Sequence, residues 1–118
     1  MSVLKPLHCV SGTERLTAFR LVAEAVLPYS ATNYYVYTLR RRKLKPNGTY
    51  MTESGEQVGD SYSLATRSFA AVVPVTLYEN DRGLLMADGD RLYLEIATVG
   101  FPAVVNLSWE LDIQAVTR

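Results

Sequence analysis

Apolar and polar residues alternate most regularly near the end of the chain. From Val105 to Ala115 every second residue is apolar and the residues between are polar. A period of two places the apolar row on one face of a β-strand, whereas a helix would scatter it around its axis. The row consists of Val105, Leu107, Trp109, Leu111, Ile113 and Ala115. We predict a half-buried strand whose apolar row, Trp109 included, packs into the core.

A second alternating run precedes this strand. Asp88-Gly89-Asp90 is a turn signal, Arg91–Thr98 alternates, and Gly100 and Pro102 end the run. We therefore predict two antiparallel strands joined through Gly100–Pro102, both half-buried.

Four earlier segments also have the composition of strands. Pro6 confines the first to a sheet edge, and Pro74 places the last at an edge or a bulge, because proline donates no ladder hydrogen bond. Glu14–Leu27 also contains alanine, leucine and a four-residue Arg20/Glu24 spacing, so a helix is the alternative there. The segments are Val3–Val10, Glu14–Leu27, Asn33–Arg42 and Phe69–Glu79.

Turn and loop signals separate these segments. Ser11-Gly12-Thr13, Lys45-Pro46-Asn47-Gly48 and Asn80-Asp81-Arg82-Gly83 predict turns. Thr49–Thr52 would be the strand returning from the second turn, and Glu53–Asp60 a loop. Ser61–Ser68 is open between a short helix, a strand and coil.

The whole pattern predicts an all-β fold. Seven or eight short strands between turns are typical of an antiparallel β-sandwich, of jelly-roll type or a related small barrel. With 118 residues, the chain is expected to form one domain over residues 1–118. The expected core residues from the facing sheets are Phe19, Leu21, Phe69, Val73, Leu94, Leu107, Trp109 and Leu111.

Charge and composition narrow the function. Twelve basic residues balance twelve acidic ones, which argues against a nucleic-acid binder or a polybasic membrane anchor. Cys9 is the single cysteine, so no intrachain disulfide is expected and the setting is a reducing cytosol or a particle assembled there. No apolar run reaches the ~18 residues of a membrane span, and Pro6 and His8 interrupt any signal peptide.

Catalytic and cofactor sites are not expected. His8 and Cys9 are adjacent, so on a strand they point to opposite faces and do not pair as base and nucleophile. Asp88 and Asp90 lack the rest of a calcium loop and read as turn residues. The sequence therefore predicts no enzyme, no cofactor and no metal.

The one dense charge feature is Arg40-Arg41-Arg42-Lys43. It reads either as a solvated strand end or as a contact for an acidic partner. Tyr34, Tyr35 and Tyr37 lie just before it, and aromatic residues beside arginines suit an interface, although a core role for most of the tyrosines is the alternative. We take these seven residues as the candidate partner-binding set. Docking through them would weaken as salt rises.

Several segments resemble small tailed-phage structural proteins. Asn33–Leu39 is similar to their early strand, Val73–Leu77 to their middle strand, and Ala87–Leu92 with Thr98–Pro102 to their C-terminal hairpin. The resemblance implies a head decoration (cement) protein or a related jelly-roll minor virion protein. Such modules cap capsomers as trimers and stabilise the shell, without catalysis.

The resulting expectation is a virion protein on the capsid surface, assembled in the host cytoplasm. Its partners would be the major capsid protein and itself, as a homotrimer, with no membrane or nucleic acid involved. The alternatives are a phage tail, fibre or adsorption component, or a carbohydrate-binding β-sandwich that uses surface tyrosines.

Overall fold

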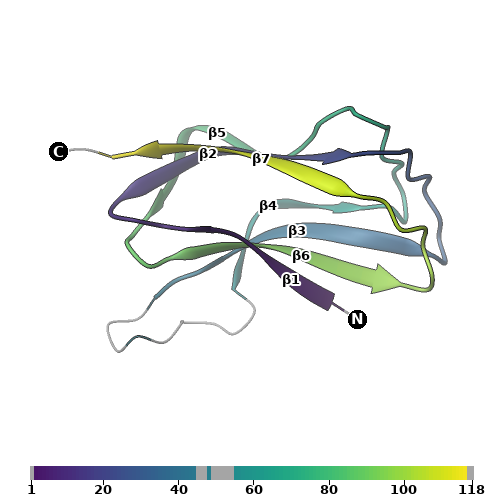
Figure 1. Ribbon diagram of the computed structural model, residues 1–118, viewed down its shortest axis with the longest axis horizontal. Coiled ribbons are helices and arrows are strands. Elements are labelled where there is room, and N and C mark those ends of the chain that lie inside the picture. Colours follow the sequence, from purple (N-terminus) through teal and green to yellow (C-terminus); the bar gives the residue numbers. More distant parts are fainter. Residues whose placement is uncertain (1, 45–47, 49–54, 117–118) are drawn as a thin grey trace.

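Seven β-strands and no helix form the part of the chain that the computed structural model describes, residues 2–44, 48 and 55–116 (Figure 1). The all-β prediction is therefore confirmed, and the helical alternative for Glu14–Leu27 is wrong. The strands are β1 (Ser2–Cys9), β2 (Glu14–Ala23), β3 (Tyr34–Arg42), β4 (Glu56–Ser63), β5 (Val75–Met86), β6 (Arg91–Val99) and β7 (Leu107–Ala115).

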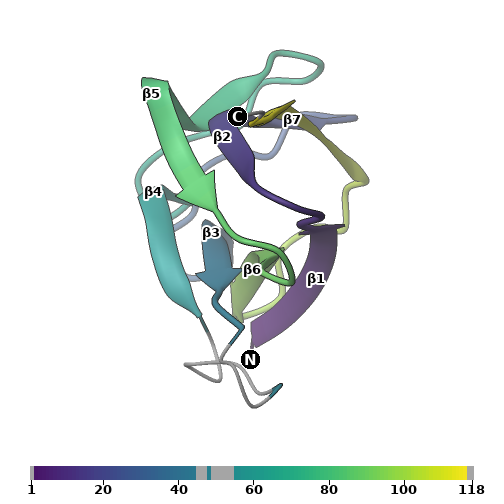
Figure 2. The same cartoon turned by 90° about the vertical axis from the view of Figure 1, so that its left-hand side faces the viewer.

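The strands form two antiparallel sheets that pack face to face. One sheet has the order β1-β6-β3-β4 and the other β5-β2-β7, and Figure 2 shows them as two layers. The predicted antiparallel β-sandwich is thus confirmed. A jelly roll has eight strands in two Greek keys, whereas seven strands are present among the described residues.

The predicted hairpin between the last two strands is wrong. β6 and β7 belong to different sheets, and residues 100–106 cross from one layer to the other. The reason lies in this connection, which is longer than a usual hairpin loop. Gly100 has a φ of 68°, and a Cβ there would lie 2.3 Å from Asn33 Oδ1, so the chain is held against the loop before β3 instead of turning back.

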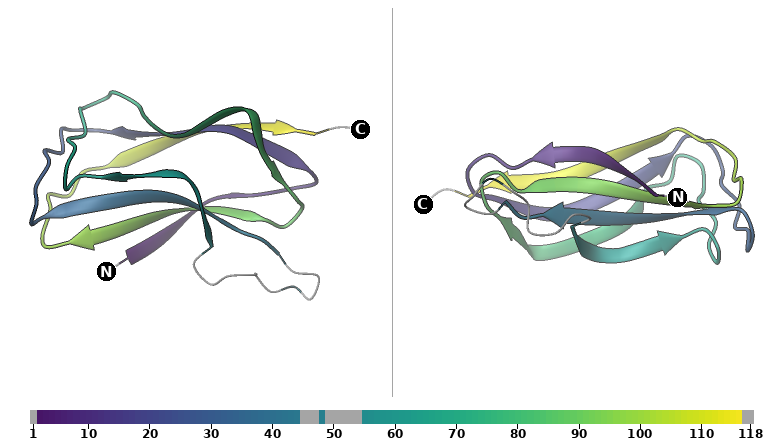
Figure 3. Two further views of the ribbon diagram at one scale, coloured as in Figure 1. Left: turned by 180° about the vertical axis from the view of Figure 1, so that it is seen from behind. Right: turned by 90° about the horizontal axis from the view of Figure 1, so that it is seen from below.

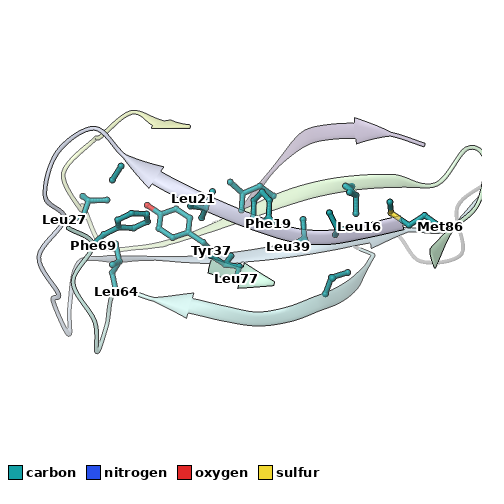
Figure 4. Packing of buried hydrophobic residues seen from close by; sticks show 14 of the residues in the cluster. Leu16, Phe19, Leu21, Leu27, Tyr37, Leu39, Leu64, Phe69, Leu77 and Met86 are labelled. Atoms are coloured by element: carbon teal, nitrogen blue, oxygen red, sulfur yellow. The ribbon is translucent and has the colours of Figure 1, made fainter. Parts of the chain in front are cut away.

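β2 is the central strand of its sheet and contributes most to the core. Its register against β7 shifts between Leu16 and Ala18, where β2 has one extra residue, and this residue lets both Leu16 and Phe19 point inward. Across the core, Phe69 makes edge-on ring contacts with Tyr37 and Tyr62, with centroid distances of 6.2 and 5.7 Å. Figure 4 shows Leu27, Leu64 and Phe69 packed at one end of this core and Met86 at the other.

Two predicted core residues are not in the core. The inward row of β7 is only half-buried, and 38% of Trp109 is exposed. The cause is that β7 is a sheet edge, and among the described strands β1, the facing edge, does not close over it. Val73 is exposed because it lies in the irregular segment before β5, not in a strand.

The opposite side of the sandwich is closed by β4 and β5. Gly59 in β4 has a φ of 73°, and a Cβ there would lie 2.3 Å from the Leu77 carbonyl oxygen of β5. Only glycine allows the two backbones to approach so closely. The sandwich therefore has one closed side, at β4 and β5, and one open side, at β1 and β7.

Three further boundaries differ from the predictions. Phe69–Pro74 makes only isolated bridges, from Phe69 to Leu27 and from Ala71 to Ala23, and the strand begins at Val75. Residues 80–83 lie within β5, but they bulge out of the ladder because Glu79 and Leu84 pair with Ala18 and Leu16. Glu56–Asp60 is part of β4 and not a loop.

The predicted turn Lys45–Gly48 and the returning strand Thr49–Thr52 fall, except for Gly48, outside the described residues.

Candidate docking surface

The six connections between strands divide between the two ends of the sandwich. Residues 24–33, 64–74 and 100–106 lie at one end, which we call the apolar end (Figures 1 and 3). Residues 10–13 and 87–90 connect strands at the other end, which we call the charged end, and residues 43, 44 and 55, which follow β3 and precede β4, lie there too. The basic run of the sequence lies toward the charged end.

The arginines of the basic run alternate between faces, as strand geometry requires. Arg40 lies on the outer face of its sheet and donates to Glu95 Oε1 from Nε and Nη2, at 3.2 and 3.1 Å. The Arg42 guanidinium lies over the Tyr93 ring, 5.0 Å from its centroid. Both arginines are thus engaged by β6, the neighbouring strand.

Arg41 points the other way and is only 7% exposed. It donates to Glu56 Oε1 from two guanidinium nitrogens and to the Leu85 carbonyl oxygen at 3.1 Å. These bonds join β3, β4 and β5 at the charged end. Lys43 is exposed beyond the strand end. The structure therefore does not gather the four basic residues into one surface.

The three candidate tyrosines also differ in position. Tyr37 is 1% exposed and stacks against Tyr35, and burial raises the pKa of its phenol above the usual range. Tyr35 is half-buried and donates from its hydroxyl to the Ala103 carbonyl oxygen at 3.1 Å. Tyr34 is half-buried at the start of β3. Tyr37 thus offers no surface to a partner, and Tyr35 supports the loop after β6.

The residues weighed for catalysis and metal binding have local roles. His8 Nε2 lies 3.0 Å from Glu14 Oε1, whereas Cys9 is exposed and pairs with Arg91 in the ladder. Asp90 is buried and accepts from the Leu44 and Ala87 amides, at 3.2 and 3.1 Å. Within residues 2–44, 48 and 55–116, no group of three or more His, Cys, Asp or Glu residues is placed to hold a metal. Nor does this part of the chain contain a helix that could cross a bilayer.

The apolar end carries most of the exposed large apolar side chains. Glu24 and Arg67 are the only charged residues in its three loops. Phe101 is 96% exposed and Val104 is 90% exposed, and both lie in the loop that crosses between the sheets. The exposed apolar set at this end is Val26, Tyr29, Val72, Val73, Phe101 and Val104.

Hydrogen bonds tie the three loops to one another. The backbones of Leu27 and Phe69 exchange two bonds of 2.9 and 2.7 Å, which joins the first loop to the second. The Phe101 amide donates to Asn33 Oδ1 at 2.9 Å, which joins the third loop to the first. Glu24 and Asn106 are joined by a backbone bond and a side-chain bond. The exposed apolar side chains therefore stand on loops that are already ordered.

Val72 adds local strain at this end. Its φ is 60°, a value that β-branched residues rarely adopt, and its side chain is exposed. Its amide donates to the Ala23 carbonyl oxygen at 2.9 Å, which holds the turn against β2. Strained backbone is often found at functional sites, where surrounding structure enforces it.

Comparison with known proteins assigns no family. No family model matches the chain, and no curated protein or solved structure is similar to it. The surfaces described above are therefore the basis for a functional assignment.

Sequence reasoning missed the apolar end, although a signal was present. Loops are usually polar, yet 25–29, 70–74 and 101–105 are runs of apolar residues and proline without a charge. Because such runs also occur in buried strands, the pattern alone does not separate an exposed apolar loop from a core segment.

Proposed function

We propose that this protein is a structural protein of a tailed-phage virion, that it decorates the capsid, and that it attaches through its apolar end. The observation that carries the proposal is the concentration of exposed apolar side chains on three ordered, nearly uncharged loops. Exposed apolar patches of this kind mark interaction sites on otherwise polar surfaces. The phage context comes from the resemblance of the strand and turn segments.

The energetics fit repeated attachment to a shell. Burying a side chain such as Phe101 or Val104 contributes about 1.5–3 kcal/mol at most. The hydrogen bonds between the loops reduce the entropy lost on docking, because the loops do not need to order. Modest binding by one copy becomes firm when several linked copies attach together.

The proposal includes the partners and the absence of catalysis. The major capsid protein is the proposed partner, and added contact across neighbouring capsid subunits is the proposed mechanism of stabilisation. The protein acts on the virion surface as a homotrimer and catalyses no reaction. A zero formal net charge favours self-association over repulsion.

The test is binding to phage heads prepared without this protein. We expect the purified protein to bind them at a fixed number of copies per head. Phe101→Ser should reduce the bound amount strongly, because it removes the most exposed ring of the apolar end. Leu85→Ser is the matched control, since Leu85 is an exposed apolar residue near the charged end. Failure of the unaltered protein to bind heads, together with specific binding to a glycan array, would overturn the proposal.

The trimer is tested separately by analytical ultracentrifugation at micromolar concentration. We expect the mass of three chains. A monomeric mass at every concentration would contradict the proposed trimer. A monomer that also fails to bind heads would contradict the whole functional proposal.

A further inference from the structure

Among the described strands none pairs with the outer edge of β7, and this free edge differs from the other sheet edges. β1 contains Pro6 and a register shift next to it, both of which protect an edge against pairing. The edges at β4 and β5 approach each other and close one side of the sandwich. β7 has nine residues without proline or glycine, and the extra residue in its pairing with β2 lies on β2. A long, regular, unprotected edge is a site where another strand can pair.

The backbone groups on this edge follow from the register. The Glu24 amide donates to the Asn106 carbonyl oxygen, so this is a hydrogen-bonded pair. Hydrogen-bonded and non-hydrogen-bonded pairs alternate in an antiparallel ladder, which makes Ser108, Glu110 and Asp112 the residues bonded to β2. The amides and carbonyls of the odd residues therefore point to the free edge. These residues are Leu107, Trp109, Leu111 and Ile113.

The same odd residues carry the half-exposed apolar row. Their β2 partners include Phe19 and Leu21, which are fully buried, so the row points toward the gap between the sheets. A cavity of about 240 Å³ opens there, lined in part by Lys5, Ile96 and Leu107. A strand added beside β7 would cover Trp109 and Leu111 while satisfying their backbone groups.

The outer row of β7 is acidic. Glu110 and Asp112 share one cation, Arg20, whose Nε and Nη2 lie 3.3 and 2.6 Å from their carboxylate oxygens. One negative charge on this row is left without a matching cation among these three residues.

The charges on β7 favour a different polypeptide over a second copy of this chain as the partner of this edge. In a two-fold pair of β7 strands, residues of the same parity face each other. The register that pairs the full length of β7 is centred on Leu111 and sets Glu110 opposite Asp112 of the other copy. Like charges placed opposite one another destabilise a ladder.

We propose that the edge of β7 is a docking site for an extended segment of another polypeptide, which joins the sheet as an antiparallel strand. The segment alternates apolar residues, which cover Trp109 and Leu111, with lysine or arginine, which face Glu110 and Asp112. This mode of recognition combines main-chain bonds with side-chain pattern. The site is separate from the apolar end and does not depend on attachment to heads.

The test supplies such a strand on the chain itself. One spacer residue, an Asn-Gly turn and a strand of alternating valine and lysine are appended after Arg118. The spacer lets the added strand bond to the odd residues of β7, and the added strand is long enough to fold back as far as Leu107. We expect hydrogen exchange of the Trp109, Leu111 and Ile113 amides to slow by about tenfold or more. We also expect Trp109 fluorescence to shift to shorter wavelength. The same strand added as a separate peptide should perturb the NMR signals of the same residues.

Two matched extensions distinguish strand pairing at the edge of β7 from non-specific association of the added segment. Glutamate in place of lysine should give much weaker protection, and proline at every second position should give none. The proposal is overturned if the valine–lysine strand leaves the odd amides unprotected while those of Ser108 and Glu110 stay protected. It is equally overturned if the glutamate strand protects as well. Protection of the odd amides in the unextended chain that grows with concentration would assign the edge to a second copy instead.

Discussion

The two ends of the sandwich use their side chains in opposite ways. At the charged end, Arg41 and Asp90 are buried and their polar atoms bond to neighbouring strands and turns. At the apolar end, the loops are held by backbone bonds around buried Leu27 and Phe69, and the apolar side chains of Phe101 and Val104 face outward. Arg41 and Asp90 are thus held by bonds within the fold, whereas Phe101 and Val104 are exposed.

This contrast shows why a dense charge run is a poor guide to a binding surface here. Arg40 and Arg41 are paired with Glu95 and Glu56, so a partner would have to compete with existing ion pairs. Exposed apolar side chains have no partner to exchange, and burying them gains free energy directly.

Phe69→Ala should cost about 3–5 kcal/mol of unfolding free energy, because it leaves a cavity beneath the apolar end. Phe69 is fully buried and contacts the rings of Tyr37 and Tyr62. Urea denaturation measures the loss. Phe101→Ala, at an exposed ring of the same end, should leave stability within about 0.5 kcal/mol. Equal losses in the two variants would mean that Phe101 is a core residue and not a docking residue.

Arg41→Ala should lower the unfolding free energy by about 1.5–3 kcal/mol, the range for hydrogen bonds that involve a charged group. The change removes the bonds to Glu56 and to the Leu85 carbonyl oxygen. The control is Lys43→Ala at an exposed position of the same run, where stability should barely change. If both variants are as stable as the parent while head binding is lost, the basic run serves a partner and not the fold.

Val72→Gly should stabilise the protein by roughly 1 kcal/mol, because relief of the backbone strain exceeds the entropy cost of glycine. The φ of 60° at Val72 suits glycine. The same change should weaken binding to heads, since it deletes an exposed apolar side chain of the docking surface. Thermal unfolding and head binding measured on one preparation give both values. A variant that is less stable would contradict the strain at this turn.

Tyr37→Phe should have its effect only at alkaline pH. Burial raises the pKa of the Tyr37 phenol, so the folded state holds its proton more tightly than the unfolded state. Stability is therefore intact below the ordinary tyrosine pKa of about 10 and falls as the pH rises above it. Unfolding free energies at pH 8 and pH 11 should show a smaller alkaline loss in the variant than in the parent. An identical loss would mean that Tyr37 is not the buried titrating group.

Much of the fold could be predicted from the period of two. The β3 pattern correctly placed Tyr35, Tyr37 and Leu39 on one face, and the alternation of β7 is also as predicted. The period does not report which strand lies at an edge, and this explains the error at Trp109. Its apolar row points inward as expected, but the facing sheet does not cover it.

Less of the candidate site than of the fold could be predicted from the sequence. That Arg40 and Arg42 lie opposite to Arg41 follows from strand geometry, but their acidic partners come from β6 and β4, and only the fold shows which carboxylates they meet. The three loops of the apolar end are far apart in the sequence and come together because every second crossing between strands returns to the same end. Their shared lack of charge becomes meaningful only when they are seen side by side.

The most direct test of attachment through the apolar end is retention on heads across a salt series. The variant Phe101→Ser/Val104→Ser is compared with Arg40→Ala/Arg42→Ala and with the parent. We predict that the parent stays bound as salt rises, because burial of apolar surface is not screened. The apolar-end variant should bind at least about tenfold more weakly at every salt concentration, as expected for a loss of roughly 1.4 kcal/mol or more. The arginine variant should match the parent. The opposite result would contradict the account: the parent dissociates from heads at high salt, the arginine variant does not bind them, and the apolar-end variant binds like the parent.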